Sequence, residues 1–347
     1  MAAGAVVPVS VAGVKSAPST VSGILLVDKP AGFTSHDAVA RTRRLAGTRK
    51  VGHAGTLDPM ATGLLVIGVN SSTRLLTYVV GLDKEYFATV RLGAATTTDD
   101  AEGEFVGEGA DAASVDALTS GRLESAFAEQ RGTIVQVPSS VSAIKVDGKR
   151  AYALVRSGEE VQLAGRTVTI SELELLGPAR PATEGDRRFV DQDVRVVCSS
   201  GTYIRAIARD VGALLRVGGH LTSLRRTRIG PFAVAEAATP DDLATRLEAG
   251  ESLPLLPPAD VARRLFPVLE VDRDRGIALG HGQRIDVTRA EADAAGDGLL
   301  AAITADERLL GLVAVTKGTG KSVVNFPPDD PQTTDPAGQP DTEEPPA

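Results

Sequence analysis

The sequence predicts a mixed α+β protein in which a larger domain built around an antiparallel sheet is followed by a small β-rich domain. Two stretches, 83–93 and 191–198, alternate apolar and polar residues as strands with one covered face do. Two others, 35–45 and 204–211, place their apolar residues at helical spacing. Past the proline-rich segment 253–258, the pattern changes to short β-like pieces, which indicates a second domain.

Composition is that of a soluble globular protein. The chain has 347 residues, enough for two domains, with 42% hydrophobic and 24% charged residues. No apolar run approaches the roughly 20 residues that span a bilayer. Cys198 is the single cysteine, and no Cys/His spacing typical of a metal site occurs. We therefore expect a cytoplasmic protein without a metal.

Charge is unevenly distributed along the chain. The net charge is −8, but six acidic residues and no basic ones follow residue 325, so residues 1–325 carry only −2. Basic residues cluster in 41–50 and again in 225–228. Either cluster could dock a phosphate backbone or could be a solvated face. The composition of 1–21 and of 326–347 predicts disordered extensions.

The first half of the chain is expected to alternate strands and helices. Segment 23–27 is a short apolar strand that ends in a Pro/Gly turn at 28–32. Thr34 and Ser35 begin a helix to about Leu45, and 64–69 is a buried strand. The remaining elements are a helix capped by Ser72 and Thr73 and ending at Val80, the strand 83–93, a polar loop at 96–103, and a helix from Ser114 or Asp116 to about Arg131.

The second half continues this pattern. Residues 136–152 are expected to form a strand, an Asp-Gly turn and a helix from about Arg150. Strands at 166–176 and 191–198 precede the helix that begins after Gly201. Thr239 caps a further helix at Pro240. The final β pieces are 266–271, 282–285, 299–303 and 309–315, with a turn at 280–283.

Asp58 is the candidate catalytic residue. It lies in segment 52–63, which reads Gly-His-Ala-Gly-Thr-Leu-Asp-Pro-Met-Ala-Thr-Gly. Three glycines and Pro59 give this segment a stiff, specific backbone, and loops of this kind often hold catalytic groups. The alternative is a structural Asx-turn.

Segment 52–63 resembles the signature of the TruB family of transfer-RNA pseudouridine synthases, Gly-His-x-Gly-x-Leu-Asp-Pro-x-Ala-x-Gly, whose aspartate is catalytic. Further matches extend the resemblance from about Gly23 to Pro231. They are the segments 28–35, 83–86, 92–103, 136–152, 198–205 and 219–230. One residue more than in the family pattern lies between Pro138 and Ser142. The final β pieces resemble the family's small PUA-type RNA-binding domain.

The resemblance implies a role for several side chains. Asp58 would be the nucleophile, Tyr86 would stack on a flipped base and is a candidate for the late proton abstraction, and Arg205 would pair with Asp58. The substrate-binding residues would be Lys29, His53, Lys145, Tyr203 and Leu224. Structural alternatives are a solvated turn lysine for Lys29, a structural histidine for His53 and a strand aromatic for Tyr86.

The implied function is isomerisation of the uridine at position 55 in the T-loop of transfer RNA, by base flipping and without a cofactor. The partner would be the T-loop and T-stem of transfer RNA, bound by a monomer. The expected domains are 22–250 for catalysis and 259–325 for RNA binding. Two rivals remain: a non-catalytic RNA-folding module, and a glycoside hydrolase-like enzyme, which would need a second carboxylate.

Overall fold

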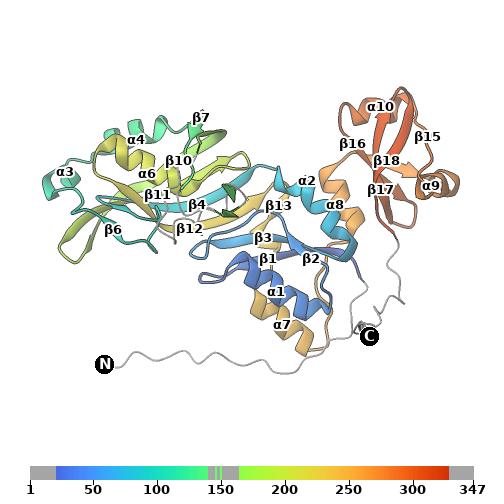
Figure 1. The fold of residues 1–347 in the computed structure, drawn as a ribbon, viewed down its shortest axis with the longest axis horizontal. Helices are drawn as coiled ribbons and strands as arrows, with labels where there is room; N and C mark the ends of the chain where they lie inside the picture. The colour runs from blue at the N-terminus through green and yellow to red at the C-terminus, as the bar shows by residue number, and fades with distance from the viewer. Residues whose placement is uncertain (1–20, 140–144, 147–148, 151–163, 328–347) are drawn as a thin grey trace, which may run out of the picture.

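The computed structural model describes residues 21–139, 145–146, 149–150 and 164–327 (Figure 1). Most of the predicted terminal extensions, together with Tyr152 and the Asp147-Gly148 turn, lie outside these residues. In the described part of the chain, no helix is long and apolar enough to cross a membrane.

A long mixed sheet forms the larger part of the described structure. Its strands follow the order β1-β3-β12-β4-β11-β10-β7, with β2 added beside β3 and β13 beside β12. The bounds are β1 Gly23–Lys29, β3 Thr62–Val69, β12 Gly219–Ile229, β4 Lys84–Leu92, β11 Arg187–Cys198, β10 Arg166–Glu184 and β7 Gly132–Gln136. The two added strands are β2 at Val51–His53 and β13 at Phe232–Ala233. Every pairing is antiparallel except that of β12 with β3. The predicted antiparallel sheet is therefore confirmed.

Helices cover this sheet in two places. α1 (Ser35–Ala46) and α7 (Pro240–Glu248) lie side by side against β1 and β3 (Figure 1). Both begin as predicted, because Thr34 and Thr239 accept hydrogen bonds from the first-turn backbone as N-caps. α4 (Ser120–Ala128) and α6 (Ile204–Leu215) pack on β10, β4 and β12, where Phe127 and Ile207 enter the core.

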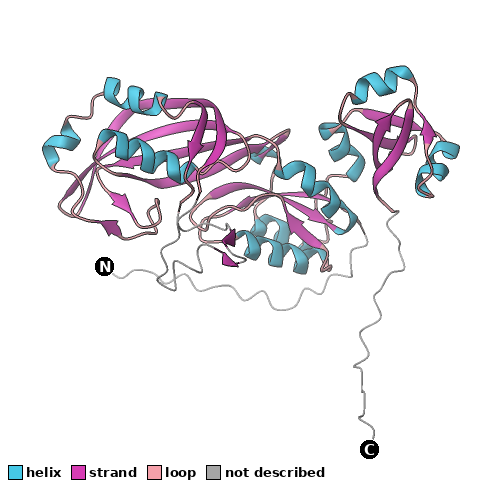
Figure 2. Cartoon of the chain, turned by 45° about the horizontal axis from the view of Figure 1, so that its top comes forward, coloured by secondary structure: helices cyan, strands magenta, loops and turns pink. Residues whose placement is uncertain are grey.

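A second sheet forms the C-terminal part (Figure 2). Its strands follow the order β14-β16-β17-β18-β15. The bounds are β14 Val268–Val271, β16 Leu299–Thr304, β17 Leu309–Thr316, β18 Thr319–Asn325 and β15 Ile285–Asp286. α9 (Arg273–Gly280) and α10 (Arg289–Ala295) accompany it. α8 (Pro258–Leu265) connects the two parts, and one apolar cluster contains residues of both sheets, among them Ile24 and Leu312. The β-rich C-terminal prediction is thus confirmed.

Several predicted elements in the first half differ from the observed ones. Asp28 and Lys29 belong to β1 instead of a turn, because they pair with Leu64 and Gly63 of β3. The helix predicted to end at Val80 is a 3-10 helix, η1 (Asn70–Leu75), followed by the short α2 (Leu76–Val80). The predicted loop 96–103 is flanked by a paired hairpin, β5 (Ala95–Thr96) and β6 (Phe105–Val106).

The predicted helix 114–131 is two helices, α3 (Ala112–Asp116) and α4, because the Thr119 hydroxyl caps the second one. Arg150, predicted to begin a helix, belongs to β9 (Lys149–Arg150), which pairs with β8 (Lys145–Val146). β12, β18 and helices α8 to α10 were not predicted.

The residues at the inner ends of the two predicted extensions, Val21 and Phe326, differ in how they contact the fold. Phe326 is buried at 3% exposure, and its N–H donates to the Leu310 carbonyl at 2.8 Å. At the other end, the Asn70 side-chain amide donates to the Val21 carbonyl at 2.9 Å. Phe326 therefore belongs to the packed core, whereas Val21 is 54% exposed and is joined to the fold through its backbone carbonyl.

Candidate active site

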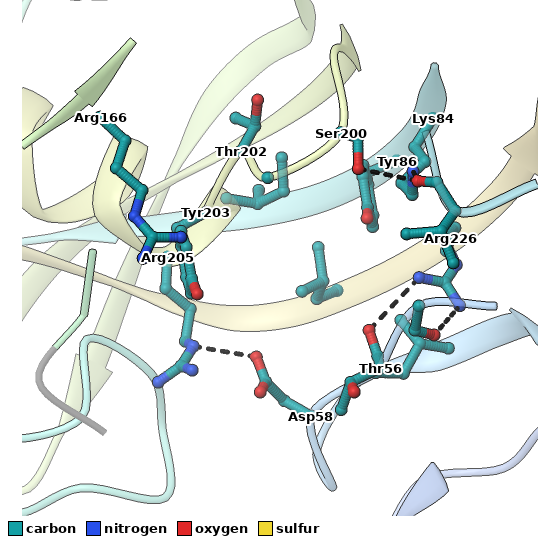
Figure 3. A pocket seen from close by; sticks show the side chains of 16 residues that line it. Thr56, Asp58, Lys84, Tyr86, Arg166, Ser200, Thr202, Tyr203, Arg205 and Arg226 are labelled. Carbon is teal, nitrogen blue, oxygen red and sulfur yellow. Dashed lines mark hydrogen bonds and ion pairs between the residues drawn. The ribbon is translucent and has the colours of Figure 1, made fainter. Parts of the chain in front are cut away.

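A cavity of about 580 Å³ opens beside β12, which pairs in parallel with β3 on one side and antiparallel with β4 on the other. Figure 3 shows that side chains from four segments converge on it. These are the loop Gly55–Asp58, strand β4 with Lys84 and Tyr86, the turn Ser200–Arg205 at the start of α6, and strand β12 with Leu224 and Arg226. Val80 and Arg166 complete the lining.

The Asp58 loop has a fixed backbone. The Ser35 hydroxyl accepts from the Leu57 N–H at 2.8 Å and donates to the Leu57 carbonyl at 3.1 Å. Gly63 has a φ of +102°, and a Cβ there would lie 2.2 Å from the Arg226 carbonyl oxygen, so no other residue fits this close approach of β3 to β12. The loop holds the Asp58 side chain at the cavity with 35% of it exposed.

Arg205 contacts the Asp58 carboxylate directly. Its Nε lies 3.0 Å from Asp58 Oδ2, and its side chain is 4% exposed. Its Nη1 donates to the Thr98 carbonyl at 2.7 Å and lies 3.3 Å from Asp100 Oδ2. A guanidinium fixed in this way restricts the orientation of its carboxylate partner. The Asp58–Arg205 pairing expected from the sequence is present.

Asp100 is a site residue that the sequence analysis did not single out. Its side chain is 3% exposed, and its Oδ2 contacts the Arg205 guanidinium although Asp100 does not line the cavity. The Thr98 hydroxyl donates to Asp100 Oδ1 at 2.6 Å and orients it. The Thr-Asp-Asp sequence at 98–100 was the available signal, but its polarity indicated a surface loop.

Tyr86 and Leu224 form an apolar part of the cavity wall. They lie on neighbouring strands β4 and β12 and are 7% and 6% exposed. Burial is the largest influence on Tyr86 and raises the pKa of its hydroxyl, so Tyr86 is a neutral phenol at physiological pH. Tyr203, the N-cap residue of α6, also lines the cavity, and its N–H donates to Gln136 Oε1 at 2.8 Å.

Two cavity cations were not predicted as site residues. Lys84 is buried, and its Nζ donates to the carbonyls of Val80 at 2.9 Å and Leu82 at 2.6 Å. Burial, aided by the nearby charge of Arg226, lowers the pKa of Lys84 to about 8. Arg226 is 1% exposed, whereas the sequence analysis placed it in a cluster on one surface. That cluster is divided, because Arg225 faces another way and pairs with Asp28 at 2.7 Å.

Three predicted substrate-binding residues lie elsewhere or outside the description. Lys29 has no exposed surface and does not line the cavity. Its Nζ donates to the carbonyls of Phe33 at 2.6 Å and of Pro59, the residue after Asp58, at 3.2 Å. Burial lowers the pKa of Lys29 to about 8. His53 is half-buried on β2 and is also absent from the cavity lining. Lys145 is in β8, but its side chain is not described.

The site contains no metal-ligand cluster within the described residues, since no three His, Cys, Asp or Glu side chains gather there as ligands would. The groups available for chemistry are the Asp58 carboxylate with its guanidinium partner Arg205, the buried cations Lys84 and Arg226, and the aromatic ring of Tyr86. This set suits a nucleophilic carboxylate acting on a planar, hydrogen-bonding ring that stacks against Tyr86.

Three family profiles match consecutive parts of the chain. The profile of the TruB family pseudouridylate synthase N-terminal domain matches residues 43–204. Profiles of the tRNA pseudouridylate synthase B C-terminal domain and of the tRNA pseudouridine synthase II C-terminal region match 205–262 and 266–327.

Similar proteins were found in bacteria. tRNA pseudouridine synthase B of Leifsonia xyli subsp. xyli is 53% identical over 309 residues, which cover 89% of this chain and 98% of that protein. The protein of the same name from an Arthrobacter species is 51% identical over 315 residues, covering 90% and 99%.

Solved structures support the same fold. A Cbf5-Nop10-Gar1 complex contains a chain that is 25% identical, with a TM-score of 0.61 over 88% of this chain and 84% of that one. A chain of an H/ACA RNP bound to a substrate RNA containing 2'-deoxyuridine is 24% identical, with a TM-score of 0.61 over 89% and 86%.

Proposed function

Because this chain belongs to the TruB family of pseudouridylate synthases, we propose that it converts the uridine at position 55 in the T-loop of transfer RNA to pseudouridine. The observation that carries this proposal is the contact of Asp58 with Arg205 at 3.0 Å, at the edge of a cavity walled by Tyr86 and Leu224. A base inside a folded RNA cannot reach such a cavity unless it is turned out of its stack.

The residues divide the chemistry between them. The flipped uracil stacks on Tyr86 and packs against Leu224, which removes it from water. Ionised Asp58, oriented by Arg205, is the nucleophile at the sugar anomeric carbon or at the base. The bond between the anomeric carbon and N1 then breaks, and the base turns. Its C5 bonds to the anomeric carbon, and the bond to Asp58 breaks, which regenerates the free carboxylate. The proton on C5 is then lost to a base and N1 takes up a proton, which restores the aromatic ring.

Tyr86 fits the stacking role better than the role of proton acceptor. Burial raises the pKa of its hydroxyl, so at neutral pH the side chain carries its proton. A neutral phenol provides a flat, uncharged face for the base and a poor base for the final proton transfer.

The rest of the chain supports RNA binding in this proposal. The small C-terminal sheet and the basic segment around α1 would hold the RNA backbone, while residues 22–250 carry out catalysis. Within α1, Arg44 is exposed, whereas Arg41 pairs with Asp241 at 2.6 Å.

A glycoside hydrolase is disfavoured by the position of the second carboxylate. Asp100 shares Arg205 with Asp58, but it is 2% exposed and does not line the cavity. Hydrolysis by paired carboxylates requires both groups to face the bond that breaks.

The test is incubation of the purified protein with an unmodified transfer-RNA transcript, followed by mapping of pseudouridine. We expect one pseudouridine per transcript, at position 55, and none in a matched transcript with cytidine there. Absence of pseudouridine would overturn the proposed activity, and pseudouridine at another position would overturn the site.

A further inference from the structure

Arg226 occupies the strand that separates the two halves of the site. On one side of β12, Arg226 pairs with Gly63 of β3, the strand that leaves the Asp58 loop. On the other side it pairs with Tyr86 of β4. Its side chain is among the largest fully buried ones in the described chain and points into the cavity region (Figure 3).

The Arg226 guanidinium connects both ends of the Asp58 loop. Nη2 donates to the Gly55 carbonyl at 3.1 Å and Nη1 to the Thr56 carbonyl at 3.3 Å, three and two residues before Asp58. Nε donates to the Leu64 carbonyl at 2.8 Å, after the loop has joined β3. The planar fork therefore fixes the separation of the two ends of the loop, which one lysine ammonium could not do with the same geometry.

Arg226 also acts on Tyr86 and Lys84. A hydrogen bond and the charge of Arg226 partly oppose the rise in the pKa of Tyr86, and its charge adds to the lowering of the pKa of Lys84. Its carbonyl partners are neutral, and no carboxylate in the described part of the chain forms an ion pair with it. A buried cation beside a second cation is an unfavourable way to stabilise a fold, because an apolar residue of similar size avoids the desolvation penalty.

We propose that Arg226 is a positioning residue that holds the Asp58 loop and Tyr86 at a fixed separation across the cavity. This inference rests on the proposed function, since it concerns the geometry of that reaction. Arg226 does not contact the Asp58 carboxylate in the structure, so it acts through the loop backbone. Its loss should misplace the nucleophile and leave the RNA-binding surfaces intact.

The first test compares Arg226→Lys with Arg91→Lys. Arg91 lies on β4 with Tyr86 but on the opposite face, where it forms a two-pronged pair with Asp191 at 2.8 and 2.9 Å. Both substitutions keep the charge and lose the fork. We expect kcat of Arg226→Lys to fall about 100-fold, as for a displacement of about 1 Å at a reacting group, with KM within about threefold.

The control, Arg91→Lys, should keep kcat within about twofold of the unmodified protein, even if its melting temperature falls as much as that of Arg226→Lys. Equal kcat losses in the two variants at equal destabilisation would overturn the positioning role. If the unmodified protein forms no pseudouridine, the proposed function itself fails. If it is active and Arg226→Lys retains kcat, only this inference fails.

The second test keeps Arg226 and displaces the Gly55 carbonyl, which accepts a hydrogen bond from Arg226 Nη2. Gly55 has a φ of +87°, and a Cβ there would lie 3.6 Å from Arg226 Nη1, so Gly55→Ala strains the loop at the contact. We expect a kcat loss of about tenfold or more in Gly55→Ala, and a double variant with Arg226→Lys that is no slower than the slower single variant. Losses that multiply would show that Arg226 does not act through the loop. If Arg226→Lys does not fold, an unchanged kcat in Gly55→Ala would overturn the proposal and a loss would support it.

Discussion

The Nε atom of Arg205 lies 3.0 Å from Oδ2 of Asp58, although the two residues are far apart in the sequence. Arg205 is 4% exposed and is held at its other end by the Thr98 carbonyl and the Asp100 carboxylate. The carboxylate is thus accessible from the cavity while its partner is buried. This arrangement exposes the reactive group and keeps water from the guanidinium that orients it.

Replacing Arg205 by lysine should separate catalysis from binding. Arg205→Lys keeps the charge but cannot contact Asp58, Asp100 and the Thr98 carbonyl together, so kcat should fall by roughly 100-fold or more. The affinity for transfer RNA should change by less than about tenfold, because the Arg205 side chain is 4% exposed and offers little surface for RNA to contact. Single-turnover rates and filter-binding measurements check both values, and a kcat close to that of the unmodified protein would contradict the orienting role.

Lys29 should make stability depend on pH above pH 8. Burial lowers its pKa in the folded protein from 10.5 to about 8, so between those values the unfolded chain binds the proton more strongly. The free energy of unfolding contributed by this group is therefore lowest below pH 8 and rises with pH up to about 10. Lys29→Met should reduce the slope of that free energy between pH 8 and 9.5, measured by urea unfolding. Lys321→Met, at an exposed position, is the control, and equal slopes for Lys29→Met and the unmodified protein would refute the prediction.

The basic segment on α1 should contribute to the salt dependence of RNA binding. Neutralising Arg41, Arg43 and Arg44 to glutamine should lower the slope of log affinity against log salt by about 1 to 2.7, since each phosphate contact contributes about 0.9. The lower end of that range is favoured by the structure, because Arg41 already pairs with Asp241 and Arg43 donates to the Val51 carbonyl. The control triple variant changes three exposed arginines at the far end of the sheet, Arg122, Arg180 and Arg188. Equal slopes in both triple variants would mean that the α1 arginines are only a solvated face.

The C-terminal boundary should lie after Pro327. Deleting residues 328–347 removes six acidic side chains and should leave activity and stability unchanged, with tighter non-specific RNA binding. Deleting 326–347 removes the same charges together with Phe326, which is 3% exposed in the apolar cluster that joins the two sheets. The second deletion should lower the free energy of unfolding by about 3 kcal/mol or more. Equal stabilities of the two truncated proteins would contradict the structural account of Phe326.

The part of the site carried by contiguous motifs could be predicted from the sequence. Asp58, Tyr86, Arg205 and Leu224 each stand in a short motif that resembles one of the TruB family, and all four line the cavity. The strands with clear alternation, such as β4 and β11, and the capped helices α1 and α7 were likewise predictable, because their signals are local.

What the sequence did not reveal depends on pairing between distant segments. Lys29 ends a strand whose neighbour is Gly63, and only this pairing buries the lysine. β12 contains Arg225, Arg226 and Arg228 close together, and this polar composition did not indicate a strand. It also gave no sign that Arg226 lies on the same inward face of β12 as Leu224. Arg226 is buried because β3 and β4 flank it, and neither relationship is visible in the local pattern.

The central claim, that Asp58 is the nucleophile, is tested most directly by the single-turnover rate of pseudouridine formation in Asp58→Asn. The amide keeps the size and one acceptor of the carboxylate but loses its nucleophilic charge. With the variant in excess over unmodified transfer RNA, we expect no detectable pseudouridine, while affinity for the RNA stays within about tenfold of the unmodified protein. Substantial pseudouridine formation by folded Asp58→Asn, at a rate near that of the unmodified protein, would contradict the account.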